Sequence, residues 1–504
     1  MSVRDKTEIG AGLAAARPSR AIAPGERIHI VGAQGAGASA AAILAAWAGA
    51  DVDGCDAGGP SQYTPALAAV GVHVAPAHAA AHVLGPRRPA RLAVTKALTA
   101  VNPDHPELHA ARAAGVPIEP WQQVVADAAC GRLLIGVAGT HGKSTTSGWI
   151  VHTLVSLGAD PGAFVGALLP AAITGIGVAA TARKGAGEAF VVEADEYAGN
   201  FDAYRPAVIV LPSAEWDHPD VFADGEAVLA AFEAWIRRDA EDRAPGARQP
   251  VLVANVGDAG VATVVDRLAD WPGRILRTAV DPVPGTADLT ATIVEADPDG
   301  TTVRVTFGDG VHGARLPTAG RHNVSNALGV IGACLAAGHP IEPVLAALAT
   351  FAGVGRRLEC KGEAAGVTVY DDYGHHPTAI RETLAAVRQR APGRRVWAVY
   401  EPLTFHRTAA LLEPFAEVLA TADAVAIAAI WAGRDPDTTV ASAGGLADAV
   451  ARRNPAIPVA APGSVEATAH WLSTVVDPGD VVLVMGGGRS YRIGELLLEH
   501  LARR

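Results

Sequence analysis

Short apolar runs that end in glycine-rich turns recur along this chain. Residues 28–31 form one such run, and glycines and small residues follow it as far as Trp47. Residues 133–138 form another, and residues 146–157 after its turn have the pattern of a helix. Short apolar runs bounded by turns are typical of strands buried in parallel sheets. The pattern therefore predicts an α/β protein built from strand–turn–helix units.

Three blocks of such units divide the chain. At 504 residues, the length also suggests about three domains. We expect a flexible tail over 1–24, then domains over 25–125, 126–352 and 353–504, the last after a hinge at 353–357. The further predicted strands lie near 51–56, at 190–194, 207–211 and 251–254, and at 367–370, 396–400, 424–429 and 481–485.

One part of the second block has a different pattern. Residues 291–294 and 302–305 alternate between apolar and polar positions, and Asp-Pro-Asp-Gly at 297–300 separates them. Turn residues between two alternating segments are typical of a β-hairpin. The sequence thus predicts a small antiparallel element beside the parallel sheet.

The turn after residues 133–138 has the composition of a phosphate-binding loop. Glycines let backbone N–H groups point at phosphate oxygens, lysine supplies a cation, and serine offers a hydroxyl to Mg²⁺. The spacing differs from the usual one, and a chance Gly-Lys-Ser in a glycine-rich chain is the alternative. The residues concerned are Gly139, Thr140, His141, Gly142, Lys143, Ser144 and Thr145.

Carboxylates follow two further strands of the second block. Glu193 begins the run Glu-Ala-Asp-Glu, and His218 lies in a second acidic run at 215–220. The carboxyl ends of parallel strands meet beside the phosphate loop, where Mg²⁺ must be held. We favour metal binding for both residues over a surface carboxylate and a helix-capping histidine.

The turn after residues 28–31 is a second candidate for phosphate binding. Its glycines could hold a diphosphate, although their spacing is not that of a dinucleotide fingerprint. A close-packed turn between strand and helix explains the motif equally well. The candidate residues are Gly32, Gln34, Gly35 and Gly37, with Ser61 and Thr64 after the next strand.

Composition excludes several classes of protein. The formal charge of −11 argues against a nucleic-acid-binding surface. No run of 18 or more uncharged apolar residues is present, so we expect no membrane insertion. The four cysteines lie far apart, which favours reduced thiols and a cytoplasmic setting.

In their order, these motifs resemble the Mur ligases, the ATP-dependent amino-acid-adding enzymes of peptidoglycan precursor synthesis. The resemblance runs from about Arg27 to the C-terminus. It implies a Rossmann-like domain for the UDP sugar, a central P-loop ATPase and a Rossmann-like C-terminal domain for the amino acid. The matching motifs are 139–145, 193–196, Asp217-His218, 322–326, 353–357 and the run Asp-Asp-Tyr-Gly-His-His-Pro at 371–377.

The resemblance also implies a reaction. ATP phosphorylates the lactyl carboxylate of UDP-N-acetylmuramate, and an amino group attacks the acyl phosphate. Lys143 would balance charge on the β- and γ-phosphates, which phosphoryl transfer requires. Ser144 and Glu193 would hold one Mg²⁺, and His218 a second.

Four more residues are expected at the ATP. Asn323 and Asn326 lie three residues apart, hence on one helix face, and an amide has the donor and acceptor that adenine needs. Helix capping by Asn323 is the alternative. Arg356 and Asp372 resemble residues that reach the γ-phosphate and the ribose from the third domain, where an ordinary ion pair is the alternative.

The amino acid is expected at His375, His376 and Arg407, although one histidine could merely cap a helix. Arg407-Thr408 matches the L-alanine-adding members, and a planar guanidinium suits a carboxylate. Glu401 and Leu403 depart from that pattern, and Glu401-Pro402 matches the related ligases that attach a recycled tripeptide instead. We expect L-alanine, in a monomer or homodimer.

Two other classes are less well supported. A folylpolyglutamate synthetase-like ligase would share the ATPase core, but it should lack the N-terminal nucleotide domain and the His-His-Pro run. A non-catalytic nucleotide-binding module would be expected to have lost Lys143, Glu193 or His218.

Overall fold

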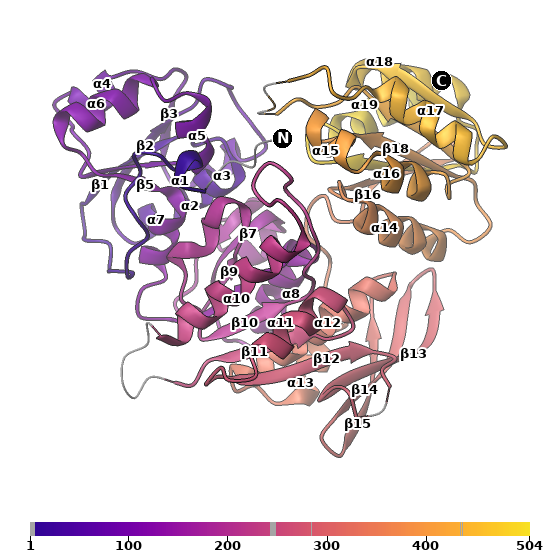
Figure 1. Ribbon diagram of the computed structural model, residues 1–504, viewed down its shortest axis with the longest axis horizontal. Coiled ribbons are helices and arrows are strands. Elements are labelled where there is room, and N and C mark those ends of the chain that lie inside the picture. The colour runs from indigo at the N-terminus through magenta and orange to yellow at the C-terminus, as the bar shows by residue number, and fades with distance from the viewer. Residues whose placement is uncertain (1–5, 242–247, 284, 434, 436, 504) are drawn as a thin grey trace.

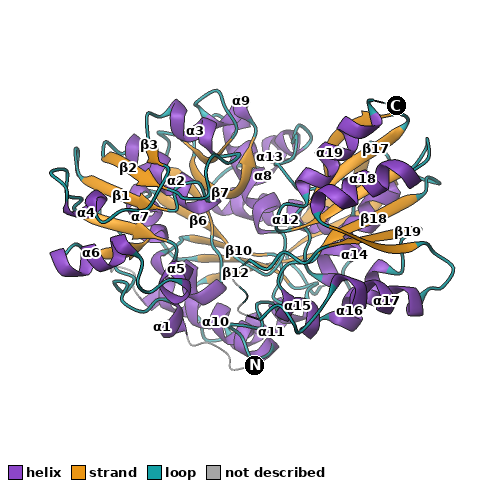
Figure 2. Cartoon of the chain, turned by 90° about the horizontal axis from the view of Figure 1, so that it is seen from above, coloured by secondary structure: helices purple, strands orange, loops and turns teal. Residues whose placement is uncertain are grey.

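Three sheets, each covered by helices, organise the chain into three α/β domains (Figure 1). The computed structural model describes residues 6–241, 248–283, 285–433, 435 and 437–503. Seen from above, the strands of the first and third domains lie on opposite sides of the central one (Figure 2). The predicted fold class, three α/β domains with parallel sheets, is confirmed.

The first sheet is fully parallel, in the order β3-β2-β1-β4-β5. Alternate residues of β1 face opposite sides, so Ile28 and Ile30 pack with α2 and α7, while Val31 packs with α4 and α6. The elements are α1 (Lys6–Ile9), β1 (Arg27–Val31), α2 (Ala36–Trp47), β2 (Asp51–Cys55), α3 (Thr64–Ala69), β3 (His73–Ala75), α4 (Ala81–Leu84), β4 (Arg91–Val94), α5 (Lys96–Val101), α6 (Pro106–Ala114), β5 (Ile118–Pro120) and α7 (Trp121–Ala128).

The segment before β1 packs against this domain. Ile9 is buried, and Arg17 forms ion pairs with Glu119 (3.0 Å) and Asp127 (2.8 Å). The flexible tail expected over 1–24 is therefore wrong for residues 6–24, because these ion pairs and the buried isoleucine hold the segment in place. Residues 1–5 lie outside the described part of the chain.

The central sheet has ten strands, in the order β15-β14-β13-β12-β11-β10-β6-β9-β7-β8. Helices α8, α12 and α13 cover one face, and α10 and α11 cover the other. The elements are β6 (Leu133–Val137), α8 (Lys143–Ser156), β7 (Gly162–Leu169), α9 (Ala171–Thr174), β8 (Ala180–Arg183), β9 (Ala189–Glu193), η1 (Tyr197–Ala203), β10 (Val208–Leu211), α10 (Gly225–Glu241), β11 (Val251–Asn255), α11 (Ala259–Arg267), β12 (Arg274–Val280), β13 (Leu289–Asp297), β14 (Gly300–Phe307), β15 (Gly310–Leu316), α12 (Arg321–Ala336) and α13 (Ile341–Leu348).

The predicted hairpin is confirmed as β13–β14, with Asp297 opposite Gly300. A third antiparallel strand, β15, pairs with β14. Because β13 also pairs in parallel with β12, the antiparallel strands extend the main sheet and do not form a separate small sheet.

The third sheet has the order β16-β17-β21-β18-β19-β20, and its strands are parallel except for β16. Helices α14, α16 and α17 cover one face, and α18 and α19 the other. The elements are β16 (Glu359–Ala364), β17 (Val367–Asp372), α14 (Pro377–Arg390), β18 (Val396–Glu401), α15 (Phe405–Ala410), α16 (Leu412–Leu419), β19 (Ala424–Ala428), α17 (Ala443–Arg453), β20 (Val459–Gly463), α18 (Val465–Val475), β21 (Val481–Gly486) and α19 (Tyr491–Leu501).

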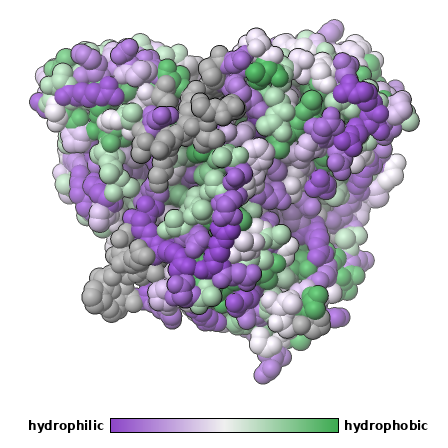
Figure 3. Space-filling model, viewed as in Figure 1, coloured by the Kyte–Doolittle hydropathy of each residue, from purple (hydrophilic) through white to green (hydrophobic). Residues whose placement is uncertain are grey.

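Polar and apolar residues are interspersed over the face shown in Figure 3. Among the described residues, no helix combines the length and the apolar character needed to cross a membrane.

Candidate active site

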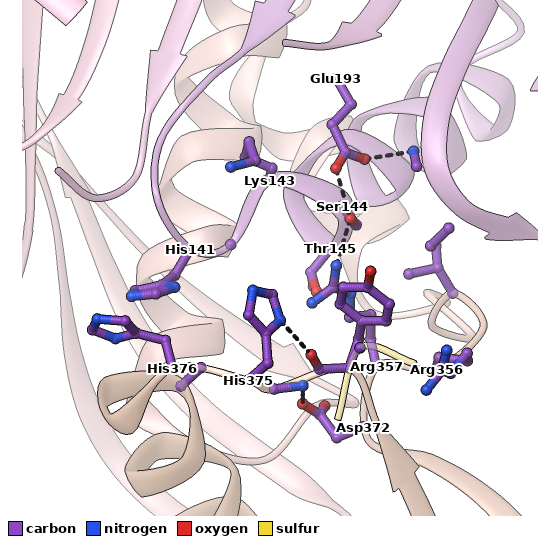
Figure 4. Close-up of a pocket in the computed structure, with 18 of the residues that line it drawn as sticks. His141, Lys143, Ser144, Thr145, Glu193, Arg356, Arg357, Asp372, His375 and His376 are labelled. Atoms are coloured by element: carbon purple, nitrogen blue, oxygen red, sulfur yellow. Dashed lines mark hydrogen bonds between the residues drawn. The ribbon is translucent and has the colours of Figure 1, made fainter. Parts of the chain in front are cut away.

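A cleft of about 1500 Å³ is lined by residues of all three domains. Tyr63 lines it from the first domain, Lys143 from the central domain, and Arg407 from the third. The candidate residues come from three separate blocks of the sequence. The fold brings many of them together along the walls of this one cleft (Figure 4).

Two glycines shape the phosphate loop between β6 and α8. A Cβ on Gly139 would lie 2.7 Å from the carbonyl oxygen of Ser213, and one on Gly142 would lie 2.6 Å from Oδ1 of Asn326. Both also have positive φ, 138° and 79°. Only glycine fits these two positions without backbone strain and a shift of the Ser213 backbone or the Asn326 side chain.

The helix after the loop begins at Lys143, three residues earlier than the sequence pattern predicts. The N–H groups of Lys143, Ser144 and Thr145 therefore lie in its first turn, and no side chain caps this end. Uncapped N–H groups and the positive end of the helix dipole form an anion site.

Thr140 and His141 fix the phosphate loop to Glu215, in the segment that follows β10. Thr140 Oγ1 donates to the carbonyl oxygen of Glu215 (2.9 Å) and accepts from its N–H (2.8 Å). His141 Nε2 lies 3.1 Å from the Glu215 carboxylate. Burial opposes ionisation of Glu215, but the hydrogen bond with His141 outweighs it and lowers the pKa of Glu215 to about 2.

Lys143 is held as a cation. Its Nζ donates to the carbonyl oxygen of Gly139 and forms a 2.9 Å ion pair with Glu196. Burial favours the neutral amine, but the nearby carboxylates Glu196 and Asp195 outweigh it, so the pKa of Lys143 is raised. A phosphate group would meet a charged lysine at this position.

Ser144 and Glu193 lie together, as expected for a shared Mg²⁺. Ser144 Oγ donates to Glu193 Oε1 (2.9 Å), and the N–H of Gly166 donates to Glu193 Oε2 (2.6 Å). Hydroxyl and carboxylate oxygens are the ligands that Mg²⁺ prefers, so the donor set fits this ion.

His218 lies with a different set of carboxylates. Its Nε2 is 3.9 Å from Glu196 and 3.8 Å from Asp217, and it groups with Asp195 and Glu196 within 4.8 Å. Asp195 and Glu196 belong to the same Glu-Ala-Asp-Glu run as Glu193, but the sequence analysis predicts metal binding only for Glu193. Ser144–Glu193 and His218–Glu196 therefore form two separate candidate metal positions, joined by Lys143 through its pair with Glu196.

Asn323 and Asn326 lie near the start of α12 and are both buried. Gly320 precedes the helix, so the capping alternative for Asn323 is wrong. Asn323 Nδ2 donates to Ala319 O (2.8 Å), and Asn326 Nδ2 donates to Asn323 Oδ1 (3.1 Å). Both line the cleft, and adenine contact stays a prediction.

Arg356 lines the cleft but is engaged within its own domain, and a contact with the γ-phosphate stays a prediction. Its guanidinium is held within the third domain by Asp371 (3.1 Å), by the carbonyl oxygen of Gly486 at the end of β21 (2.9 Å) and by the hydroxyl of Ser490 before α19 (2.8 Å). The next residue, Arg357, reaches the central domain instead and donates to Ser144 Oγ (2.8 Å). The Arg-Arg pair was visible in the sequence, but which arginine points across the cleft depends on the backbone, where Arg356 has a φ of 58°.

Asp372 has a local role in this structure. It accepts hydrogen bonds from the N–H groups of Gly374 (2.7 Å) and Leu358 (2.8 Å), which fixes the loop after β17. The carboxylate lines the cleft but is already engaged, and a contact with ribose stays a prediction.

The two adjacent histidines differ in role. His376 caps α14, as one alternative expected: its Nδ1 accepts from the N–H of Thr378 (3.3 Å). Its Nε2 lies 3.2 Å from the Trp216 carbonyl oxygen, which only accepts, so Nε2 carries the proton. Burial lowers the pKa of His376 to about 4 and holds that of His375 well below its usual range. Both rings are therefore neutral at neutral pH.

Arg407 connects the third domain to the central one. One of its terminal nitrogens lies 2.7 Å from Asp217 Oδ1 and 3.1 Å from His218 Nδ1. Its Nε is buried and has no hydrogen-bond partner among the described residues. Burial opposes ionisation of Asp217, but Arg407 outweighs it and holds the pKa of Asp217 well below its usual range.

The residues expected at the UDP sugar surround the turn after β1. Gln34 Oε1 accepts from Ser61 Oγ (3.0 Å) and Thr64 Oγ1 (2.8 Å), so these three form one cluster. Gly37 has a packing reason as well, because a Cβ there would lie 2.1 Å from Trp121. Gly32 has a φ of 72° with open space beside it, and Gly35 completes the turn.

Three family models match consecutive parts of the chain. They are the Mur ligase family, catalytic domain (residues 27–132), the Mur ligase middle domain (137–334) and the Mur ligase, glutamate ligase domain (356–488). The matches follow the three sheets in order.

Curated relatives and solved structures agree with these models. The UDP-N-acetylmuramate–L-alanine ligase of Chloroflexus aggregans is 37% identical over 94% of this chain and 98% of its own. That of Mycobacterium avium is 36% identical over 95% and 96%. The crystal structure of the UDP-N-acetylmuramate–alanine ligase from Thermotoga maritima has a TM-score of 0.74, 24% identity and coverages of 94% and 98%. A murein peptide ligase from Psychrobacter arcticus has a TM-score of 0.68, 25% identity and coverages of 95% and 99%. The chain belongs to the Mur ligase family.

Proposed function

We propose that this protein is an ATP-dependent ligase that joins L-alanine to the lactyl carboxylate of UDP-N-acetylmuramate, with release of ADP and phosphate. The observation that carries the proposal is a continuous series of contacts across the cleft. It runs from the phosphate loop at Lys143 through Glu196 and His218 to Arg407. The names of the full-length relatives support the same substrates.

The first step is phosphoryl transfer. A lactyl carboxylate oxygen attacks the γ-phosphorus of ATP, the bond to the β–γ bridging oxygen breaks, and ADP leaves. Carboxylate and phosphate repel each other, so the site must neutralise charge more than supply covalent help. Lys143 and the N–H groups at the start of α8 suit this task, with Arg357 reaching the loop from the third domain.

Magnesium would be held at two positions. Ser144 and Glu193 would supply oxygen ligands for one ion, and a ring nitrogen of His218 with carboxylate oxygens of Asp195 and Glu196 would hold the second. When bound, the ions would neutralise phosphate charge and orient the reacting oxygens. The count of two ions is part of the proposal.

The second step is attack by the amine. The ammonium group of L-alanine first gives up one proton to solvent. Its nitrogen then attacks the acyl carbon, the bond from that carbon to the phosphate oxygen breaks, and phosphate leaves as the nitrogen loses a second proton. We assign the L-alanine carboxylate to Arg407, near His375 and His376. Because both histidines are neutral, they add no positive charge to repel the incoming ammonium group.

ATP and the UDP sugar are assigned to different domains. ATP would lie on Gly139–Thr145, with adenine near Asn323 and Asn326 and the third domain contributing Arg356, Asp372 and Arg357. The UDP sugar would lie on Gly32, Gln34, Gly35, Gly37, Ser61 and Thr64.

One assay tests the acceptor. Phosphate release from ATP is measured with UDP-N-acetylmuramate and each of L-alanine, L-serine, glycine and the tripeptide L-Ala-γ-D-Glu-meso-diaminopimelate. We expect the highest kcat/KM with L-alanine. A clear preference for the tripeptide would replace the proposal with the murein peptide ligase activity, which Glu401-Pro402 favours.

A further inference from the structure

The first domain contains a dense group of potential metal ligands that lies outside the lining of the cleft. His29 on β1, Cys55 on β2, His82 on α4 and Glu107 on α6 each offer one ligand atom, and these atoms all lie within 4.8 Å of one another. The four residues come from four different elements, on the sheet face that α4 and α6 cover.

Two of the spacings between these atoms are close to those around a tetrahedral ion, whereas His82 Nδ1 is in direct hydrogen-bond contact with Glu107 Oε1 and would have to move away from it. Cys55 Sγ lies 3.1 Å from Glu107 Oε1, and His29 Nε2 lies 3.5 Å from the same oxygen. Zinc bonds of about 2.0–2.3 Å in a tetrahedron place neighbouring ligand atoms about 3.3–3.8 Å apart. Small side-chain shifts would therefore bring all four atoms to bonding distance.

His29 is oriented as metal-binding histidines usually are. Its Nδ1 lies 2.6 Å from the carboxylate of Asp53, which leaves Nε2 to point into the group. Metal-ligating histidines typically donate the other ring N–H to such a carboxylate. His29 is 2% exposed, and its Nε2 has no hydrogen-bond partner among the described residues. Its nearest acceptor, Glu107 Oε1 at 3.5 Å, is too distant for a well-formed hydrogen bond, and a metal ion between the two would satisfy both atoms.

Two more histidines surround the same carboxylate. His78 Nδ1 lies 3.6 Å from Glu107 Oε2 and 3.1 Å from Cys55 Sγ, and His105 Nδ1 lies 3.8 Å from Glu107 Oε2. His105 is 2% exposed, and both of its ring nitrogens are without a hydrogen-bond partner in the described part of the chain. A purely hydrogen-bonded cluster would be expected to pair these nitrogens, so hydrogen bonding alone does not account for the arrangement.

We propose that this group is a zinc site, with His29, Cys55, His82 and Glu107 as ligands and Asp53 orienting His29. A thiolate and two imidazoles favour Zn²⁺ over the Mg²⁺ of the ligase reaction. Four protein ligands leave no open position, which is typical of a structural site.

The site lies directly behind the turn assigned to the UDP sugar. The carbonyl oxygen of Cys55 accepts the N–H groups of Gly32 (2.8 Å) and Ala33 (3.1 Å). An ion on Cys55 would therefore hold β1, β2, α4 and α6 together beneath that turn. This role does not depend on the ligase activity proposed above.

Metal content tests the proposal. The full-length protein, purified without a polyhistidine tag or chelator, is dialysed against Zn²⁺ and excess Mg²⁺ and then against buffer, and zinc is measured by elemental analysis. We expect about one Zn²⁺ per chain. Cys55→Ser and Glu107→Gln should lose it. The matched control is His109→Ala, an exposed histidine on the same helix, which should keep it.

Cobalt substitution keeps the test independent of variant folding. Wild-type protein loaded with Co²⁺ should show a thiolate-to-cobalt charge-transfer band and intense tetrahedral d–d bands. Wild-type protein that binds no Zn²⁺, or whose cobalt form lacks the thiolate band, would overturn the proposal. Folded Cys55→Ser that retains full zinc would overturn it as well, since the ion would then lie elsewhere, for example in the cleft.

Discussion

Glu401 ends β18 at the position where L-alanine-adding Mur ligases are expected to have glutamine. The residue is 3% exposed, and its Oε2 has no hydrogen-bond partner among the described residues. Burial raises the pKa of Glu401 to about 7, although N–H groups of Ser490 and Arg489 favour the charged form. The carboxyl group is therefore largely protonated in the fold below neutral pH.

Stability should thus depend on pH through this residue. The pKa of Glu401 is about 7 in the folded protein and 4.5 in the unfolded chain. The contribution of its protonated form to the stability of the fold is therefore fully present below pH 4.5 and is lost as the pH rises through about 7. Glu401→Gln should therefore change little at pH 5 and raise the free energy of unfolding at pH 8 by about 1–3 kcal/mol. Urea unfolding at both pH values measures this. Equal effects at pH 5 and pH 8 would show that Glu401 does not titrate in this range.

Substitution of Lys143 tests the role of the phosphate loop in phosphoryl transfer. Lys143→Met should leave UDP-sugar binding intact but lower turnover by about 10²–10³-fold, by analogy with the loss of one donor to a developing anion. Binding is measured by calorimetry and turnover by phosphate release. Lys361→Met is the control, because Lys361 also lines the cleft but pairs with Glu359 away from the loop. Phosphate release near the wild-type rate in a folded Lys143 variant would contradict this role for the loop.

At the scale of elements, many buried strands were predictable from sequence, but the interior strands β4, β7 and β12 were not, and neither were the edge strands β5 and β16. The runs at 133–137 and 481–486 are apolar throughout and were predicted almost to the residue. β16 (Glu359–Ala364) is polar and lies at a sheet edge, and β5 (Ile118–Pro120) is short and ends in proline. Such strands owe their conformation to a neighbouring strand, which a local pattern does not reveal.

The N-terminal segment was missed for a similar reason. Its alanines and arginines show no periodic pattern, and its order comes from partners about a hundred residues later. Arg17 contacts Glu119 and Asp127, and Asp127 also pairs with Arg91 on β4. A segment held by distant charges cannot be distinguished from a solvated tail in the sequence alone.

The ion pairs of Arg17 should therefore stabilise this segment. Arg17→Met leaves buried carboxylates with fewer partners and should lower the free energy of unfolding by about 1–3 kcal/mol. Arg20→Met is the matched control, since the Arg20 side chain is 47% exposed and its pair with Glu26 should contribute less than about 1 kcal/mol. Urea unfolding gives both values, and limited proteolysis reports release of residues 6–24. Equal, small effects of the two substitutions would mean that the segment is held by apolar contacts.

At the scale of the whole molecule, the sequence predicted the candidate residues better than their contacts. The motifs identified Ser144, Glu193 and Arg407, because each follows a recognisable strand or family pattern. They did not reveal that Arg357 meets Ser144 or that Arg407 meets Asp217. These pairs join different domains, and their geometry depends on how the third domain lies against the second.

Substitution of Arg407 tests whether the third domain places this residue at the amino-acid site. If it binds the L-alanine carboxylate, Arg407→Lys should raise the KM for L-alanine by about 10- to 100-fold, because an ammonium group cannot reproduce the paired donors of a guanidinium. The KM for UDP-N-acetylmuramate should barely move, since the first domain is expected to bind that ligand.

Arg388→Lys is the matched control for this substitution. Arg388 lies on α14 in the same domain and pairs with Asp423 at the surface, so the L-alanine KM should not change. Thermal unfolding of both variants separates a binding effect from domain destabilisation, because Arg407 is buried against Asp217. An unchanged L-alanine KM in a folded Arg407→Lys protein would remove Arg407 from the amino-acid site. The pair with Asp217 would then be a structural contact that holds the third domain to the second.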